Sequence, residues 1–161
     1  MSCLIIIDVQ KGFINQWTGH VPARVEARQE EFERVIVTRF VNPPGSPHRR
    51  LLGWPRFAPG SADAELAFAP RDGARIMDKS TYTCATGDFI TELKQYGVER
   101  VHLCGIATDT CVLKSAVDLF EAGLEPLVLA ADCASHGGPE CHAAGLLLLS
   151  RFIGAERVIE G

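Results

Sequence analysis

The chain has 161 residues, of which 16 are basic and 20 acidic, giving a formal net charge of −4 at neutral pH. This length is sufficient for one domain with a full hydrophobic core, so we expect a single domain over residues 1–161. The basic residues are scattered, which argues against nucleic acid or an anionic membrane as a partner. The start, MSCLIIIDVQ, lacks a charged leader and a small-residue cleavage site, which predicts a cytoplasmic protein.

The cysteine spacing argues against structural metal and disulfide sites. No C-x-x-C pair occurs, which excludes a zinc ribbon, and a chain without a leader is not expected to hold a disulfide framework. Cys133, Cys141 and His142 offer three metal ligands, but no fourth candidate is grouped with them. We therefore expect no metal and no cofactor, with most of the six cysteines reduced and buried: positions 3, 84, 104, 111, 133 and 141.

Short apolar runs alternate with helix-like segments along the chain. Six runs are predicted strands, at 3–7, 34–40, 75–79, 100–106, 126–131 and 157–159. Four segments are predicted helices, at 22–33, 87–97, 109–123 and 139–152. Nearly continuous apolar strands are typical of a sheet covered on both faces. The pattern predicts an α/β fold, a doubly wound (Rossmann-like) parallel sheet of about six strands with helices on both faces. No G-x-G-x-x-G follows the first strand, so a dinucleotide site is not indicated.

Two segments carry more specific expectations. In the helix at 109–123, one face is predicted to pack on the sheet, and Gly123 to end the helix; that face comprises Val112, Leu113, Ala116, Val117 and Phe120. The segment 41–73 does not fit the alternation, because it holds six prolines and four glycines together with the aromatic residues Trp54 and Phe57. A long irregular insertion of this kind is typical of a functional loop or a contact surface.

An acid, a base and a thiol follow three predicted strands. Asp8 comes after the first strand, Lys79 ends the third, and Cys111 opens the segment after the fourth. Ligands bind outside the carboxyl ends of such strands, so we expect these side chains to meet there. Taken singly, Asp8 could cap a loop, Lys79 could be solvated and Cys111 could fill space beneath a helix. Together, an ammonium and a helix N-terminus are expected to lower the pKa of a thiol, and a carboxylate can accept its proton.

The same residues carry a family resemblance. The stretches IIIDVQKGF, DKSTYTCATGDFITEL, GIATDTCVLKSAVDLFEAG and LVLAADCAS resemble the isochorismatase-like cysteine hydrolases, which include nicotinamidases and N-carbamoylsarcosine amidohydrolase. The resemblance implies that Asp8, Lys79 and Cys111 form a catalytic Asp-Lys-Cys triad. It also implies a cis peptide bond between Ile106 and Ala107, with the backbone amides of Ala107 and Cys111 forming an oxyanion hole.

Further residues near these motifs are candidates for contacting a substrate. Phe13 and Trp17 follow the first strand and are expected to form an apolar wall, although Trp17 could instead pack under the long loop. Gln10 is expected to orient a backbone or substrate polar group, and Thr108 lies in the loop before the nucleophile.

We therefore predict a cysteine-dependent hydrolase that cleaves a C–N bond (amide, ureide or carbamoyl) of a small molecule through a thioester. Family members that cleave vinyl ethers lack the nucleophilic cysteine, so Cys111 favours C–N hydrolysis. Two alternatives remain: an ester or vinyl-ether hydrolase of the same fold, and a non-catalytic binding or assembly module.

The sequence also bears on whether the protein uses a metal and whether it assembles into an oligomer. Nicotinamidases carry a metal-binding Asp-x-His after the second strand, whereas this chain has TRFVNPPGSPHRR, with only His48 as a donor there. This departure predicts catalysis without a metal, and Arg49 and Arg50 offer a weaker alternative, a site for a substrate carboxylate. Exposed aromatic residues expected in 41–73, and the frequent assembly of these hydrolases, predict a homo-oligomer.

Overall fold

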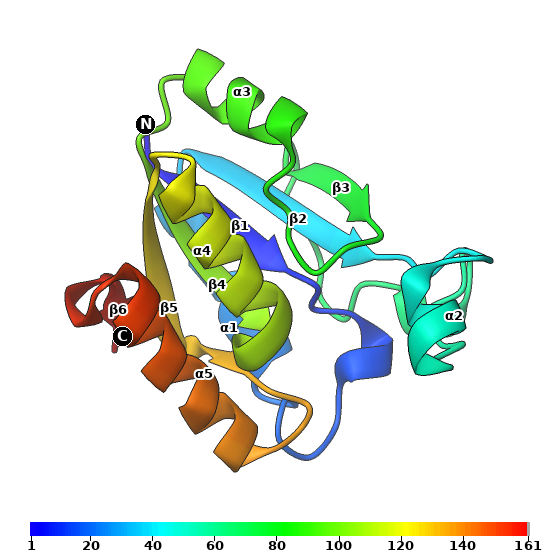
Figure 1. The fold of residues 1–161 in the computed structure, drawn as a ribbon. Helices are drawn as coiled ribbons and strands as arrows, with labels where there is room; N and C mark the ends of the chain where they lie inside the picture. The colour runs from blue at the N-terminus through cyan, green and yellow to red at the C-terminus, as the bar shows by residue number, and fades with distance from the viewer. Residues whose placement is uncertain (161) are drawn as a thin grey trace.

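A six-stranded sheet organises the chain, as the computed structural model of residues 1–160 shows (Figure 1). All neighbouring strands run parallel, in the order β3-β2-β1-β4-β5-β6. The strands are β1 (Cys3–Ile7), β2 (Arg34–Phe40), β3 (Arg75–Lys79), β4 (Arg100–Ile106), β5 (Glu125–Ala134) and β6 (Val158–Ile159). The prediction of a doubly wound parallel α/β sheet is confirmed, and the strands differ from the predicted ranges chiefly in the greater length of β5.

The strand order places a ligand crevice between β1 and β4. The chain winds from β1 outward to β3, then crosses back to β4, which pairs with the free side of β1 and leads outward to β6. Connections therefore leave β1 and β4 in opposite directions, and their carboxyl ends are adjacent, with Ile7 paired to Gly105. Such a reversal of strand order is where ligands bind in open α/β sheets. Asp8 and the turn that carries Cys111 follow these two strands directly.

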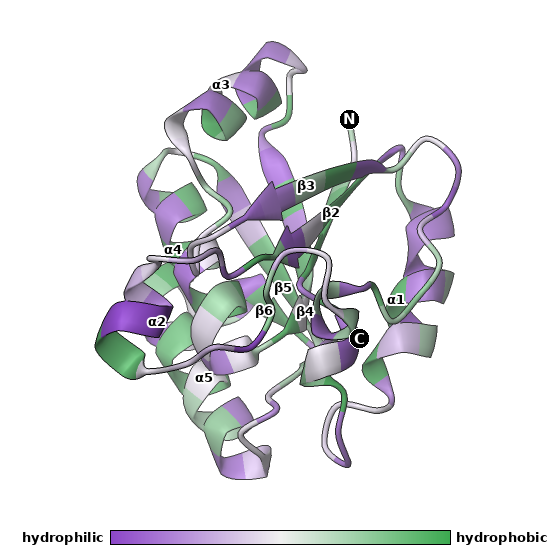
Figure 2. Cartoon of the chain, turned by 90° about the vertical axis from the view of Figure 1, so that its right-hand side faces the viewer, coloured by the Kyte–Doolittle hydropathy of each residue, from purple (hydrophilic) through white to green (hydrophobic). Residues whose placement is uncertain are grey.

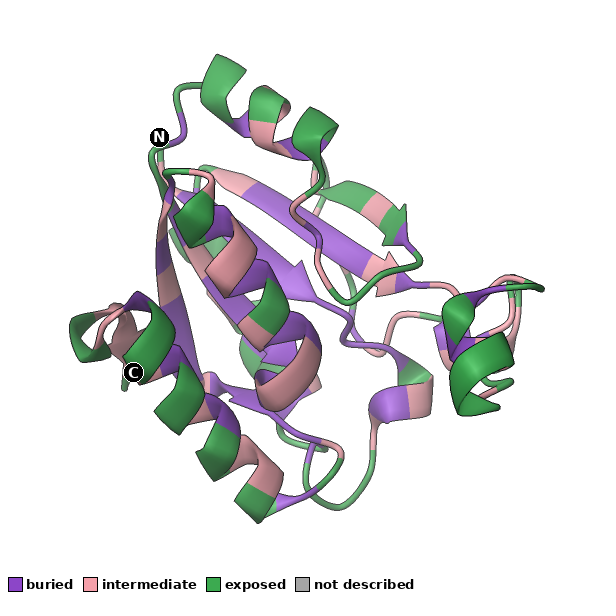
Figure 3. Cartoon of the chain, viewed as in Figure 1, coloured by how far each residue is buried: buried purple, intermediate pink, exposed green. Residues whose placement is uncertain are grey.

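Helices cover both faces of the sheet. α1 (Val21–Arg28) lies behind the sheet in the view of Figure 1, whereas α3 (Gly87–Gln95), α4 (Leu113–Glu121) and α5 (Pro139–Ile153) lie in front. The strands between them are buried, and the outward helix surfaces are exposed (Figure 3). The buried carboxylate of Asp132 on β5 holds α1 in place, because it accepts hydrogen bonds from two arginines of that helix. Within residues 1–160, none of the helices combines the length and apolar character needed to cross a membrane.

Two helix predictions need correction. The α-helix expected over 22–33 ends at Arg28 and is followed by a 3₁₀ turn, Gln29–Glu31. The helix expected over 109–123 begins as a π-helical turn, Thr108–Val112, before α4.

The buried face of α4 also differs from the predicted one. Ser115 and Leu119 are buried where Val117 and Phe120 were expected, and Phe120 is 42% exposed. Ser115 is accommodated because its hydroxyl accepts a 3.0 Å hydrogen bond from the amide of Cys84, so a polar side chain holds an inner position that the apolar pattern alone does not reveal.

The segment 41–73 folds back onto the carboxyl edge of the sheet. It contains a short helix, α2 (Pro47–Leu52), and a 3₁₀ turn, Ala62–Ala64, so it is more ordered than predicted. The side-chain amide of Asn42 donates to the carbonyl oxygens of Trp54 and Arg56, which closes the loop around α2. The ring of Phe57 is buried and stacks on Phe13 at 4.1 Å between centroids. These aromatic residues therefore build the interior rather than an exposed contact surface.

Gly105 is required where β4 meets β1. Its φ is +120°, and a Cβ atom there would lie 2.1 Å from the carbonyl oxygen of Ile7. We expect Gly105→Ala to lower the free energy of unfolding by about 3 kcal/mol or more, since overpacking and the disfavoured φ add together. Chemical denaturation measures the loss. Gly87→Ala is the control, because its Cβ meets nothing within 4 Å; equal stability of the two variants would contradict this account.

The homo-oligomer stays a prediction, but the apolar surface that supports it is not the aromatic surface expected in 41–73. Leu147 and Phe152 on α5 are 64% and 55% exposed, and Leu51 on α2 is 73% exposed; Figure 2 shows the hydropathy of these helices. Covering such side chains stabilises association. Light scattering is expected to give the mass of a dimer or a larger oligomer of the 17.5 kDa chain. A particle of 17.5 kDa at micromolar concentration would contradict it.

Candidate active site

Asp8 is held by two elements beyond its own strand. It directly follows β1, adopts φ +50°, and is fully buried. Its Oδ1 accepts a 2.7 Å hydrogen bond from the hydroxyl of Thr38 on β2, and its Oδ2 accepts one of 2.7 Å from Nζ of Lys79. Both carboxylate oxygens are therefore fixed by donors, which is what a buried charge requires.

Lys79 reaches Asp8 from β3, two strands away. Its Nζ passes 5.5 Å from the ring centroid of Phe40 and also donates to the carbonyl oxygens of Thr81 and Tyr82, at 2.8 and 3.1 Å. Burial is the largest single effect on the pKa of Lys79 and lowers it, but the charge of Asp8, the neighbouring Cys111 and the hydrogen bond to Asp8 together outweigh it, and the net pKa is raised. Lys79 is therefore a buried ammonium at neutral pH.

Cys111 completes the group, but its thiol is protonated. Its Sγ lies 3.6 Å from Nζ of Lys79, and it belongs to the π-helical turn after β4. Burial, and then the negative charge of Asp8, raise the pKa of Cys111 far above its ordinary value, and Lys79 offsets only part of this. The expectation of a lowered thiol pKa is therefore wrong: the ammonium that was to stabilise a thiolate is already paired with a carboxylate.

The turn that carries Cys111 is packed tightly against α5. The peptide bond between Ile106 and Ala107 is cis. The carbonyl oxygen of Ala107 accepts hydrogen bonds from the amides of Thr110 and Val112, each 3.1 Å long. On α5, Gly145 lies so close that a Cβ there would be 2.8 Å from the amide nitrogen of Asp109. The oxyanion-hole role of the Ala107 and Cys111 amides stays a prediction.

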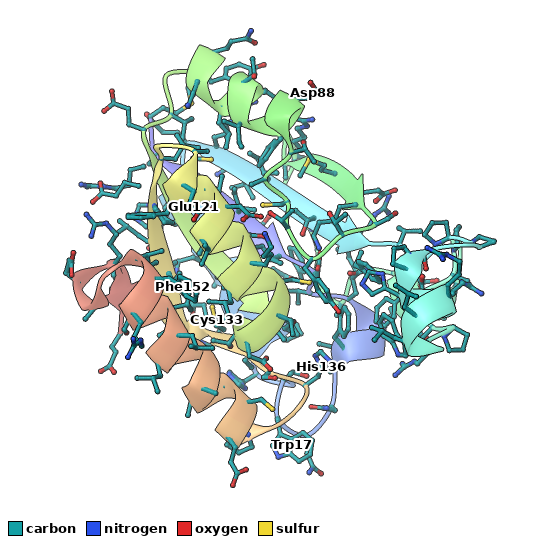
Figure 4. All side chains as sticks on the ribbon, viewed as in Figure 1. Trp17, Asp88, Glu121, Cys133, His136 and Phe152 are labelled. Atoms are coloured by element: carbon teal, nitrogen blue, oxygen red, sulfur yellow. The ribbon has the colours of Figure 1, made fainter. Side chains whose placement is uncertain are left out.

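Three of the four residues predicted to contact a substrate make contacts with other parts of the protein instead. The side-chain amide of Gln10 donates to the carbonyl oxygens of Phe40 and Ala64, so it orients backbone. The hydroxyl of Thr108 pairs with Nδ1 of His142 at 2.7 Å and is buried. Trp17 is 42% exposed and lies beside Gly138, near the start of α5 (Figure 4). These side chains support the loops around the site.

Phe13 lines a cavity at the Cys111 thiol. The cavity has a volume of about 180 Å³, and its wall comes from the loop after β1, from α2 and from the loops that follow β3 and β5. None of its residues carries a carboxylate, ammonium or guanidinium group: Phe13, Phe40, His48, Leu52, Trp54, Tyr82, Thr110, Cys111 and His136. Burial lowers the pKa of both His48 and His136, so the wall is uncharged at neutral pH.

Neither the two arginines nor the candidate metal ligands contribute to the cavity at Cys111. The guanidinium of Arg49 donates to the carbonyl oxygen of Asn42, and that of Arg50 to Gly45, so neither lines the cavity as a carboxylate receptor. Among residues 1–160, no three His, Cys, Asp or Glu side chains are grouped so that they could hold a metal ion. The donor set therefore does not fit a resident metal, and activity without one stays a prediction.

Sequence reasoning missed several residues of the site. Thr38 was a detectable candidate, because it is the one uncharged polar residue in the strand RVIVTRF. Tyr82 and His136 had no such signal, since they reach the cavity through loops of irregular structure. Figure 4 shows His136 on the loop between β5 and α5.

The charge of Asp8 is expected to suppress the reactivity of Cys111. In Asp8→Asn the raising effect of the carboxylate is lost and Lys79 is left to stabilise the thiolate, so alkylation of Cys111 by iodoacetamide at pH 8 should speed up at least tenfold. Peptide mapping after limited labelling measures the rate. Asp78→Asn, which alters an exposed ion pair with Arg39, is the control. Slower alkylation in Asp8→Asn than in the wild type would refute this electrostatic account.

The chain is similar to known proteins in sequence. The family model described as "Isochorismatase domain" matches residues 2–156. The uncharacterized isochorismatase family protein PncA of Bacillus subtilis (strain 168) is 35% identical over 81 residues, which are 50% of this chain and 44% of that protein. The uncharacterized isochorismatase family protein YwoC of the same organism is 25% identical and is aligned over 99% of this chain and 90% of its own length.

Solved structures share the fold at low sequence identity. The nicotinamidase PncA from Bacillus subtilis has a TM-score of 0.81 and 24% identity, with 99% of this chain and 100% of that chain covered. The pyrazinamidase of Pyrococcus horikoshii in complex with zinc has a TM-score of 0.81 and 24% identity, with 94% and 96% covered. Since the family model takes in nearly the whole chain, the chain belongs to the isochorismatase family and is a hydrolase.

Proposed function

We propose that this hydrolase cleaves a C–N bond (amide, ureide or carbamoyl) of a small molecule, with Cys111 as nucleophile and a thioester as intermediate. The observation that carries the proposal is the contact of Asp8, Lys79 and Cys111 at the β1/β4 crevice, with the thiol facing an aromatic cavity. The nicotinamidase and pyrazinamidase named among the similar structures act on amides, as their names state, which supports the same bond type here.

In the first half-reaction of this mechanism, the carboxylate of Asp8 is the proton acceptor. The thiol of Cys111 transfers its proton to Asp8 as Sγ attacks the substrate carbonyl carbon, and the charge of Lys79 stabilises sulfur as it becomes anionic. The amides of Ala107 and Cys111 stabilise the oxyanion. Asp8 then passes the proton to the departing nitrogen, so that amine or ammonia leaves and a thioester forms.

The second half-reaction restores the enzyme. Water attacks the thioester carbonyl while Asp8 accepts one of its protons. The sulfur leaves as a thiolate beside Lys79 and takes the proton back from Asp8. The acid product is released, and the raised pKa of Cys111 returns the thiol to its protonated state. Lys79 stays charged throughout, because its role is to hold Asp8 and to face the sulfur.

The uncharged wall supports a neutral substrate. A cavity lined by aromatic rings and neutral imidazoles offers a substrate carboxylate no charged partner, and burying one there would cost free energy. A neutral amide meets no such penalty. An ester or vinyl-ether substrate, or an inactive binding module, would show itself by the absence of ammonia release across amides, ureides and carbamoyl compounds.

The three residues are expected to act as one unit. Asp8→Asn, Lys79→Met and Cys111→Ala should each lower kcat by at least about a thousandfold, and the double variants should lose little more, because removing one member disables the others. Ammonia release measures the rates. Cys141→Ser is the control, since Cys141 lies in the first turn of α5, is partly exposed and does not line the cavity. Losses that multiply in the double variants would contradict a shared mechanism.

A further inference from the structure

His136 has an imidazole whose hydrogen-bonding capacity is unused. It lies on the loop between β5 and α5 (Figure 4), and it lines the same cavity as Cys111. Within residues 1–160, its Nδ1 is buried and has no hydrogen-bond partner. A buried polar atom without a partner costs about 1–3 kcal/mol, so its place in the wall of a reactive cavity indicates a role in the reaction.

Two contacts restrain His136. Its ring packs against Phe13 with 4.8 Å between centroids, and its carbonyl oxygen accepts a 2.9 Å hydrogen bond from the side-chain amide of Asn15. Phe13 is itself stacked on the buried ring of Phe57. The imidazole is therefore held by packing although it belongs to a loop, which is what a group that positions a small molecule requires.

The charge of Asp109 acts on this imidazole. Asp109 lies in the π-helical turn, two residues before Cys111, and its Oδ1 is also buried without a partner among residues 1–160. Burial lowers the pKa of His136; Asp109 acts to raise it, and Arg56 to lower it further. A neutral imidazole has one donor and one acceptor nitrogen. With its hydrogen on the buried Nδ1, where a neighbouring carboxylate stabilises it, Nε2 is an acceptor.

The strand order brings His136 to the Cys111 turn from the side opposite to Asp8. Asp8 follows β1 and His136 follows β5, and these two strands flank β4, which leads into the turn. An acyl group on Sγ therefore has a proton acceptor on the β1 side and a second hydrogen-bond acceptor on the β5 side. The other cavity imidazole, His48, belongs to α2, which follows β2, one strand farther from β4 than β1.

A water molecule that attacks the acyl group needs an acceptor besides Asp8. Both carboxylate oxygens of Asp8 already accept hydrogen bonds of 2.7 Å, from Thr38 and from Lys79. Asp8 can still take a proton, but it leaves the second hydrogen of the water without a partner. Aromatic and aliphatic side chains make up much of the remaining wall, so the water depends on the few polar groups there.

We propose that His136 holds the water that hydrolyses the thioester on Cys111. This inference rests on the proposed function for the thioester itself. The oxygen of the water bonds to the thioester carbon, one hydrogen passes to Asp8, and the other stays on the oxygen and donates to Nε2 of His136. The C–S bond then breaks, the sulfur takes the proton from Asp8, and the carboxylic acid leaves with the second hydrogen. His136 stays neutral and touches the reacting oxygen, so it is a catalytic residue.

The test follows the acyl-enzyme directly, with 4-nitrophenyl acetate as the probe. Attack by Cys111 releases nitrophenolate and leaves an acetyl thioester, which intact-protein mass spectrometry detects after the ester is removed. His136→Phe is expected to keep the nitrophenolate burst within about threefold of the wild type, while the acetyl group persists at least about tenfold longer. His136→Gln, which offers a carbonyl acceptor, should restore part of the rate.

Two controls separate the role of the water from a loss of packing. His102→Gln alters a histidine of β4 that does not line the cavity, and it should leave burst and lifetime unchanged. Hydroxylamine attacks the thioester in place of water, so it should clear the acetyl group from His136→Phe and from the wild type at rates within about threefold. Slow clearance in the variant, or an unchanged acetyl lifetime in water, would overturn the proposal. Thermal unfolding checks that each variant is folded, and His136→Gln carries the test if His136→Phe is not.

The same measurements distinguish failure of this inference from failure of the proposed function. Acetylation of Cys111, located by peptide mapping, with equal lifetimes in the wild type and His136→Phe supports the nucleophile and overturns the role of His136. A nitrophenolate rate equal to that of Cys111→Ala, with no acetyl group on Cys111 in any variant, overturns both. A longer lifetime in His136→Phe supports His136 even if no amide proves to be a substrate.

Discussion

The buried ion pair between Asp8 and Lys79 is the constraint on which the site depends. The two side chains are 0% and 4% exposed, so each charge has lost its water and relies on the other. A buried pair is tolerated only when its remaining hydrogen-bonding capacity is filled. Here Thr38 and two carbonyl oxygens fill it, which ties the loops after β1 and β3 to the centre of the sheet. The pair also determines that the neighbouring thiol rests in its protonated form.

The strands and the three reactive residues follow from the sequence for a simple reason. In a parallel sheet the carboxyl ends share one edge, so Asp8, Lys79 and Cys111 are brought near one another by topology alone. Their electrostatics do not follow in the same way. The raised pKa of Cys111 depends on burial and on which charge Lys79 is paired with, and both are properties of the packed structure.

The cavity wall was the least predictable part of the molecule. Phe13 and Trp17 are four residues apart, yet one lines the cavity and the other lies near the start of α5, because the chain turns between them. Gln10 is polar and close to Asp8 in sequence, but its side-chain amide donates to the carbonyl oxygens of Phe40 on β2 and of Ala64 in the 41–73 segment. Apolar periodicity likewise missed the buried Ser115, whose hydroxyl has a local partner.

The position of α2 separates much of the cavity wall from the three residues at the strand ends. Asp8, Lys79 and Cys111 lie at or just after the ends of β1, β3 and β4, whereas His48 and Leu52 on α2, and Trp54 just after it, belong to the 41–73 segment beyond the edge of the sheet. Figure 1 shows α2 at the margin of the molecule, away from the helices that cover the sheet. Changes of length or composition in this loop therefore alter the shape of the wall while the strand ends keep their geometry. Under the proposed function, a chain built in this way can acquire a new substrate range in evolution, or by loop grafting, without rebuilding the group of Asp8, Lys79 and Cys111.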